Sequence, residues 1–232
     1  MMHQSINKHK IYFYLLILLF SSTIFNFNTV SKFNDLNLIK SIDIEGLNPK
    51  EEFYLRDKLN IFKDSNIFSI KKENIEETLK IFNFLDYFSI KKIFPSKLII
   101  STKKTNFLAS SIVDGKEYYI GENGKLTLSS EVTDEKNLPL VFGKFSVEEF
   151  LNLQKIISKE NIDLNKIKKY FYYQSQRWDI EDENGLVLKL PYGNVENSLK
   201  IYKKLIDNNI ITSIKIIDFR IKNNLILTHD KK

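Results

Sequence analysis

The sequence predicts an α+β protein in which an amino-terminal transmembrane helix precedes two mixed domains. The window Ile11–Val30 holds twenty residues without a charge, and its first ten residues are all apolar. Between residues 39 and 106, strand-like and helix-like periodicities follow one another in the order strand, helix, helix, strand, strand. From Phe107 onward, short alternating segments bounded by turn residues predict a mostly antiparallel β domain with inserted helices.

The uncharged window is long enough to anchor the chain, because a membrane-spanning helix needs about 20 mainly apolar residues. Lys8 and Lys10 precede it, and a short basic flank is typical of the cytoplasmic side. We therefore expect residues 1–10 to form a cytoplasmic tail and the bulk of the chain to be periplasmic, held in the cell inner membrane by one span at 11–30. A cleaved signal peptide, with a weak cleavage site at Thr29-Val30-Ser31, and a buried helix are the alternatives.

Composition excludes most enzyme classes. The 232 residues contain no cysteine, which rules out thiol catalysis and thiolate metal sites. His3 and His9 lie in the tail, so His229 alone cannot supply a His-based triad or a multi-His metal site. The net charge of +6 is spread along the chain, as on an ordinary solvated surface. We expect no enzyme activity, no catalytic residue, no cofactor, no metal, no nucleic acid and no small-molecule substrate.

The first domain is expected to open with a half-buried strand at Ile39–Glu45, where apolar and polar residues alternate. Asn48, Pro49 and Glu51 then occupy the positions of an N-cap, a first helical residue and the acidic member of a capping box. A helix should run from there to about Leu59. The residues expected to be partly inward on it are Phe53, Leu55 and Leu59.

A second helix is expected at Lys72–Leu85, where apolar residues recur at helical spacing. The residues that form this stripe are Ile75, Leu79 and Phe82. A strand around Phe88 and Ile90 follows, and Leu98–Thr102 should return as its antiparallel partner. Two helices can cover one face of such a three-stranded sheet, and they allow the first strand to pair in parallel.

The second domain should form its sheet from eight segments, with an apolar stretch around Pro139 between the third and the fourth. These are Phe107–Val113, Glu117–Ile120, Lys125–Leu128, Lys168–Gln174, Arg177–Glu181, Leu186–Leu190, Ile214–Arg220 and Leu225–His229. Asn123-Gly124 and Asn184-Gly185 favour hairpin turns. Ser146–Glu149 reads as a capping box that opens one helix. The apolar stripes of the two inserted helices are Phe150, Leu153, Ile156 and Ile157, then Val195, Leu199, Tyr202 and Ile206.

Aromatic residues crowd one of these strands, at Tyr170–Tyr173. Both faces of a strand cannot bury such side chains without partners. Either an adjacent helix covers one row, or one row forms a contact surface. Trp178, the sole tryptophan, is expected in the core or on the sheet rather than at a ligand site.

These features in this order resemble the FtsQ/DivIB family of bacterial cell-division proteins. Residues 39–106 are similar to a POTRA domain, whose opening strand ending in glycine appears as Ile42–Gly46 and whose closing hairpin appears as Ser89–Leu98. The family usually has an acidic residue and a proline after that hairpin, whereas Lys104 and Asn106 stand here. In residues 107–232 the similar segments are Asp114–Leu128, Leu138-Pro139-Leu140 and Ile217-Asp218-Phe219-Arg220.

The resemblance implies a non-enzymatic scaffold of the divisome, enriched at the division septum, that binds FtsB- and FtsL-like proteins. It implies that a partner strand adds near the carboxyl end, where a terminal strand often lies at a sheet edge. The residues expected to bind it are Arg220, Ile221, Leu225, Ile226, Leu227 and Thr228. The POTRA-like domain is implicated in recruitment, for which the exposed charges are expected to be Glu51, Glu52 and Arg56. Core closure by the last strand, and plain solvation of the three charges, are the alternatives.

Two other functions remain open at this point. A POTRA-type secretion or outer-membrane assembly module would be expected to carry several such modules, and one is evident here. A membrane-anchored envelope hydrolase would need a catalytic constellation, against which the missing cysteine and scarce histidine argue.

Overall fold

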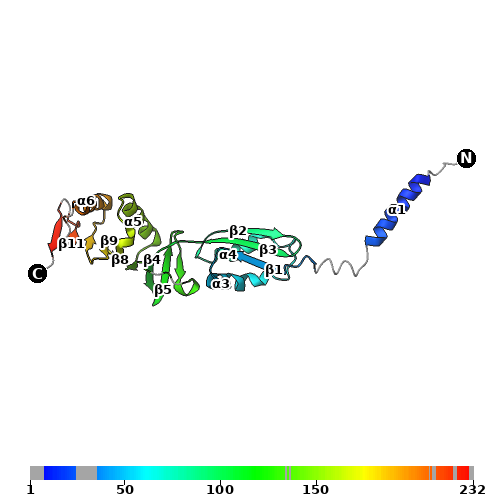
Figure 1. Cartoon of the computed structure of the whole chain (residues 1–232), viewed down its shortest axis with the longest axis horizontal. Coiled ribbons are helices and arrows are strands. Elements are labelled where there is room, and N and C mark those ends of the chain that lie inside the picture. Colours follow the sequence, from blue (N-terminus) through cyan, green and yellow to red (C-terminus); the bar gives the residue numbers. More distant parts are fainter. Residues whose placement is uncertain are drawn as a thin grey trace. The chain divides into compact units, whose positions relative to one another are not determined.

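A computed structural model describes residues 8–24, 36–133, 135, 137–208, 210, 213–221 and 224–229 (Figure 1). The described residues belong to two compact units. The first unit takes them from Met1–Glu45, Arg56–Thr78 and Ser89–Ser101, and the second from Gly46–Leu55, Leu79–Phe88 and Thr102–Lys232.

Helix α1 spans Lys8–Ile24. Its large apolar side chains from Ile11 to Phe20 are all exposed, by between 42% and 68%. Among the described residues, no helix combines the length and the apolar character needed to cross a membrane. Residues 25–30 of the expected anchor lie outside the described residues.

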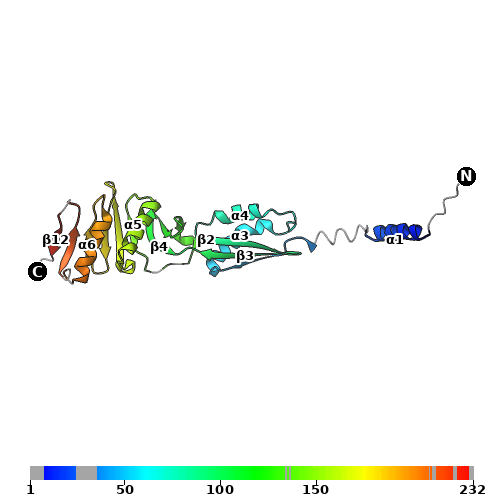
Figure 2. The same ribbon diagram turned by 90° about the horizontal axis from the view of Figure 1, so that it is seen from above.

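The expected order strand, helix, helix, strand, strand is observed, and parts of every one of these elements belong to the first unit. The elements are β1 Ser41–Glu45, α3 Pro49–Leu59, η1 Asn60–Phe62, α4 Lys72–Lys80, β2 Leu85–Ile93 and β3 Lys97–Lys104. The strands form a three-stranded sheet in the order β1-β3-β2, with β1 parallel to β3. Figure 2 shows α3 and α4 on one side of this sheet.

Two details of these helices differ from expectation. Phe53 is 69% exposed, whereas Leu55 and Leu59 are fully buried. The buried row follows the helical spacing of four residues through Glu51, Leu55 and Leu59, which places Phe53 on the opposite side. Helix α4 ends at Lys80 rather than near residue 85, since Leu85 already begins β2. Its expected stripe is buried, as predicted: Ile75, Leu79 and Phe82.

The second unit contains one mixed sheet in the order β12-β11-β10-β9-β8-β7-β4-β5-β6. Its elements are β4 Phe107–Val113, β5 Lys116–Gly121, β6 Leu126–Leu128, η2 Ser129–Glu131, β7 Leu140–Phe142, α5 Val147–Lys159, η3 Leu164–Lys166, β8 Ile167–Tyr173, β9 Arg177–Asp182, β10 Val187–Lys189, α6 Val195–Asp207, β11 Ile214–Asp218 and β12 Ile226–His229. The eight predicted strands and two predicted helices are all present, with β7 as an additional short strand.

The sheet is less uniformly antiparallel than the periodicity suggests. Five neighbouring pairs are antiparallel, but β4·β7, β7·β8 and β10·β11 are parallel. A parallel pair needs a long crossover, and helices α5 and α6 supply two of the three. The inserted helices therefore determine where the strand direction departs from an antiparallel meander.

Both helices lie over the same face of this sheet (Figure 1). Helix α5 begins with the predicted capping box at Ser146 and Glu149. Phe150 of this helix and Tyr170 of β8 are fully buried, and Trp178 of β9 is 6% exposed, so Trp178 belongs to the core. The amide of Gln154 donates a 2.8 Å hydrogen bond to the Tyr170 hydroxyl, whose pKa is raised mainly by burial.

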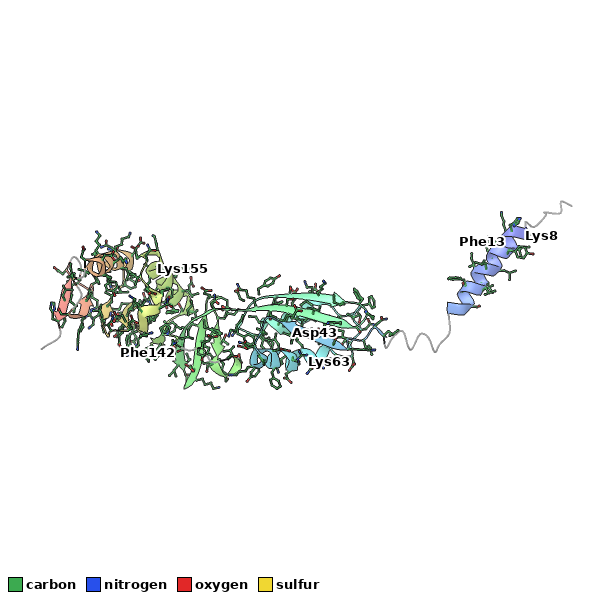
Figure 3. The ribbon with its side chains drawn as sticks, in the orientation of Figure 1. Lys8, Phe13, Asp43, Lys63, Phe142 and Lys155 are labelled. Carbon is green, nitrogen blue, oxygen red and sulfur yellow. The ribbon has the colours of Figure 1, made fainter. Side chains whose placement is uncertain are left out.

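The aromatic run on β8 divides between the two faces of the sheet. Tyr170 lies on the helix face, whereas Phe171 pairs with Asp179 on the other. There the ring of Phe171 stacks on Phe142 with a 5.2 Å centroid separation. Figure 3 labels Phe142 and Lys155 of α5, which lie on opposite sides of the sheet. We call this second side the open face.

Candidate functional site at the sheet edge

Strand β12 occupies one end of the sheet, as the sequence predicts for a terminal strand. It pairs in antiparallel register with β11, and Asp218 lies opposite Ile226, Ile217 opposite Leu227, and Ile216 opposite Thr228. Among the described residues, no strand lies beyond β12. Within the described part of the chain, the outer side of β12 is therefore not paired with a strand.

A hydrogen bond one strand away determines which backbone groups of β11 point toward β12. The Phe219 N–H donates to the Lys189 carbonyl oxygen at 2.9 Å, in the direction of β10. Backbone groups of successive residues in a strand point to alternate sides. Phe219 and Ile217 thus face β10, whereas Asp218 and Ile216 face β12.

The backbone groups of β12 follow from this alternation. Ile226 and Thr228 lie opposite Asp218 and Ile216, so their N–H and C=O groups bond inward to β11. The N–H and C=O of Leu227 consequently point outward, to the free edge. Leu227 is the central point at which another strand could hydrogen-bond to this sheet.

The side chains of successive β12 residues lie on alternate faces of the sheet. Leu227 lies opposite the buried Ile217, is half-buried and packs against the core. Ile226 and Thr228 lie on the open face, and Ile226 is 44% exposed. Leu225, just before the strand, is 38% exposed. An incoming strand would find an apolar neighbour on both faces.

Arg220 is held in place at the end of β11 by Asp218, a residue that the sequence analysis did not single out as a site residue. Asp218 Oδ1 accepts from the Arg220 N–H at 2.9 Å and from its Nε at 2.8 Å. The Arg220 side chain lowers the pKa of Asp218, and the carboxylate in turn raises the pKa of Arg220. The guanidinium is thus fixed beside the edge strand in its charged form.

A buried carboxylate lies further along the open face. Asp179 on β9 sits opposite Lys189 of β10 and is 4% exposed, and its Oδ1 has no hydrogen-bond partner in the described part of the chain. Burial raises the pKa of Asp179, although Lys189 and Arg220 oppose the shift. The row Ile226, Asp218, Lys189, Asp179 therefore leads from the apolar edge into a polar cluster. The alternation of apolar and polar residues along a single strand does not predict this polar cluster, because its members come from different strands.

A groove of about 610 Å³ adjoins the same end of the sheet, between α6 and the connection from β11 to β12. Arg220, Ile221 and Leu225 line it together with Asn197 and Ile201 of α6. Ile221 is 51% exposed. The structure thus brings all six predicted partner-binding residues to one end of the unit. It adds α6 residues that lie distant in sequence and that the analysis of single segments missed.

The predicted recruitment residues are not equivalent in the structure. Glu51 is fully buried and so cannot be an exposed recruitment charge. Its carboxylate accepts from the Lys104 ammonium at 3.2 Å and from the Thr133 N–H at 3.0 Å. Burial raises the pKa of Glu51, but the Thr133 N–H and Lys104 outweigh it and the pKa is lowered. The helical stripe that buries Leu55 buries Glu51 as well.

Glu52 and Arg56 are both partly exposed. The Arg56 Nη1 donates to the Ile42 carbonyl oxygen at 3.0 Å, which ties this side chain to β1. Their role in recruitment stays a prediction.

Comparison with known proteins finds a family model that matches part of the chain. Residues 112–220 match the family model described as cell division protein FtsQ/DivIB, C-terminal. This matched segment contains α5, α6 and the strands from β5 to β11.

Two curated relatives are cell division proteins named FtsQ. The one from Rickettsia bellii is 24% identical over 162 residues, and the one from Rickettsia prowazekii is 25% identical over 166 residues. Each match covers 70% of this chain and 60% of the relative, so the chain spans less than two thirds of these relatives. The solved major extracytoplasmic domain of DivIB from Geobacillus stearothermophilus aligns with 46% of this chain and 98% of its own, at 15% identity and a TM-score of 0.32. The chain is thus similar to cell division proteins of the FtsQ/DivIB family, and the family model matches residues 112–220 of it.

Proposed function

We propose that the protein is a non-enzymatic scaffold of the division machinery that binds FtsB- and FtsL-like partners by strand addition to β12. The match of residues 112–220 to the FtsQ/DivIB model and the similarity to two FtsQ proteins support the division role. The observation that carries the binding mode is the outward N–H and C=O of Leu227 on an edge strand. Backbone hydrogen bonds would supply affinity, and pockets for alternate side chains would supply specificity.

The two edges of the sheet differ in a way that favours β12. Natural edge strands are usually protected by lysine, proline, bulges or covering segments. On β6, at the other edge, the Leu126 carbonyl oxygen accepts a 2.9 Å hydrogen bond from the Asn83 side chain. Residues 225–229 contain neither lysine nor proline. The pairing of β12 with β11 does have a bulge between Ile214 and Ile216, but the register from Ile226 to Thr228 is regular. A regular edge segment without lysine or proline suits a strand-adding partner.

We further propose that residues 11–30 anchor the chain in the cell inner membrane, with residues 1–10 cytoplasmic and the rest periplasmic and enriched at the septum. The exposed apolar side chains along α1 and the basic flank of Lys8 and Lys10 support this assignment. Residues 39–106 would then form the POTRA-like domain and 107–232 the FtsQ-type domain. Glu52 and Arg56 would serve recruitment to the septum. Reversing both charges and measuring the septal fluorescence of the labelled chain tests this role.

Leu227→Pro is expected to abolish partner binding while the protein stays folded. Proline removes an N–H that points outward and so breaks no hydrogen bond to β11. Leu227→Ala is the matched control, because it loses the same half-buried side chain but keeps the N–H. Co-purification of the FtsB-like protein with each full-length variant measures binding, and circular dichroism reports the fold.

The position of the proline distinguishes this account from simple damage to the domain. Ile226→Pro and Thr228→Pro each remove an inward donor and should weaken the β11·β12 pairing itself. Equal partner recovery with folded Leu227→Pro and with Leu227→Ala would rule out strand addition at this edge.

A further inference from the structure

The first unit exposes a stacked aromatic pair. Phe68, in the loop before α4, and Phe94, in the turn between β2 and β3, have ring centroids 4.6 Å apart and an interplanar angle of 17°. Phe68 is 61% exposed and Phe94 is 56% exposed. These two phenylalanines come from separate segments, stack on each other and remain exposed to water. Such a pair suggests an interaction surface rather than scattered apolar residues.

The pair lies at the end of the unit where the chain arrives from residue 36. The Ile67 N–H donates to the Asn37 carbonyl oxygen at 2.8 Å, and the Lys40 N–H donates to the Ser96 carbonyl oxygen at 2.8 Å. Leu38 and Asn66 form an antiparallel bridge. Leu36, two residues before this bridge, is 47% exposed.

A short covalent tether connects this end to the proposed anchor. Five residues separate Val30 from Leu36, and the six Cα-to-Cα steps between them reach at most about 21 Å in a fully extended chain. The aromatic pair therefore cannot lie far from the membrane surface if residues 11–30 span the bilayer. This step rests on the anchor in the proposed function.

Lysines outnumber acidic residues at the same end, although Lys97 pairs with Asp43 and Lys72 lies 3.6 Å from Glu76. Residues 36–42, 61–72 and 89–97 contain seven lysines, namely Lys40, Lys63, Lys71, Lys72, Lys91, Lys92 and Lys97, and one acidic residue, Asp64. Hydrogen bonding joins these segments, since the Lys92 ammonium donates to the Ile70 carbonyl oxygen at 2.6 Å. Lys63 is labelled in Figure 3. Lysines around exposed aromatic rings are typical of surfaces that lie in an anionic lipid interface.

We infer that Phe68 and Phe94 dock on the lipid surface of the membrane that anchors the chain. The two rings enter the headgroup region, and the surrounding lysines face the phosphates of anionic lipids. Apolar burial and charge attraction add on the same surface, and the tether keeps the local lipid concentration high. Docking fixes the orientation of the first unit against the bilayer.

The test uses the full chain reconstituted in vesicles of phosphatidylcholine and phosphatidylglycerol. Because the chain has no cysteine, Ser69→Cys provides one site for an environment-sensitive fluorophore next to Phe68. Glu77→Cys, exposed on α4, is the reference site in the same unit. We expect quenching by brominated lipid at position 69 and none at position 77.

Removing both rings by Phe68→Ser and Phe94→Ser should lower the ratio of docked to undocked protein about tenfold. Phe53→Ser is the matched control, since Phe53 is 69% exposed and lies outside the pair. It should leave the ratio unchanged. Vesicles of phosphatidylcholine alone should also lower the ratio about tenfold, because the charge attraction is lost.

Each failure has a distinct signature. A chain that alkaline carbonate extracts from the vesicles would overturn both the anchor and the docking. A chain that is retained but shows equal solvent exposure at positions 69 and 77 would overturn the docking alone. If position 69 were shielded in native membranes but not in pure lipid vesicles, the aromatic pair would bind a protein rather than lipid. The inference would then be wrong.

Discussion

Replacing Phe150 by alanine is expected to lower the free energy of unfolding of the second unit by about 4 kcal/mol, the usual cost of emptying a buried phenylalanine site. Phe150 is fully buried and its ring meets Tyr170 edge-on at 5.2 Å. It also lies 6.1 Å from the ring of Trp178. Urea denaturation followed by the fluorescence of this sole tryptophan measures the loss in the same core.

Phe142→Ala is the matched control on the open face. Phe142 is 40% exposed and stacks on Phe171, so its removal should cost only about 1 kcal/mol. Equal losses for the two alanine variants would mean that α5 is not what buries the core, and the assignment of the two faces would be wrong.

Replacing Lys104 by methionine is expected to cost about 3 kcal/mol, because it leaves the buried Glu51 carboxylate without its cation. The Lys104 side chain is 22% exposed and the Glu51 side chain is fully buried, and Lys104 also pairs with Glu135 at 2.7 Å. Chemical denaturation at neutral pH measures the loss. The double variant Glu51→Met with Lys104→Met should be more stable than Lys104→Met alone.

The same cluster predicts the direction of the acid dependence. Since the folded-state pKa of Glu51 is lowered, its contribution to stability is complete above the ordinary glutamate pKa and is lost as the pH falls through the folded-state value. Glu51→Gln should flatten this part of the stability curve. Additive losses in the double variant, together with an unchanged acid limb in Glu51→Gln, would contradict the buried ion pair.

Local patterns predicted most elements because each depends on neighbours in sequence. The capping box at Ser146 and the Asn-Gly turns at 123–124 and 184–185 act within four residues, and each is found where expected. Glu51 shows the limit. It is a helix-start residue by local pattern, yet the burial of its carboxylate depends on Lys104 and Thr133, which are 53 and 82 residues away.

The edge strand was predictable and its surroundings were not. The residues of Leu225–His229 predict a strand, and the structure places β12 at one end of the sheet. The outward direction of the Leu227 N–H follows from the hydrogen bond between Phe219 and Lys189. This bond joins the end of β11 to β10, and helix α6 separates these two strands in sequence. The unpartnered oxygen of Asp179 likewise arises only when β9 lies between β8 and β10.

Amide hydrogen exchange at Leu227 tests the strand-addition model most directly. In the free protein its N–H points outward and should exchange fast, while those of Ile226 and Thr228 are protected by β11. Saturating the full chain with the FtsB-like partner should slow exchange at Leu227 and change the two neighbours little. A saturated complex in which the Leu227 amide exchanges as fast as in the free protein would contradict the account.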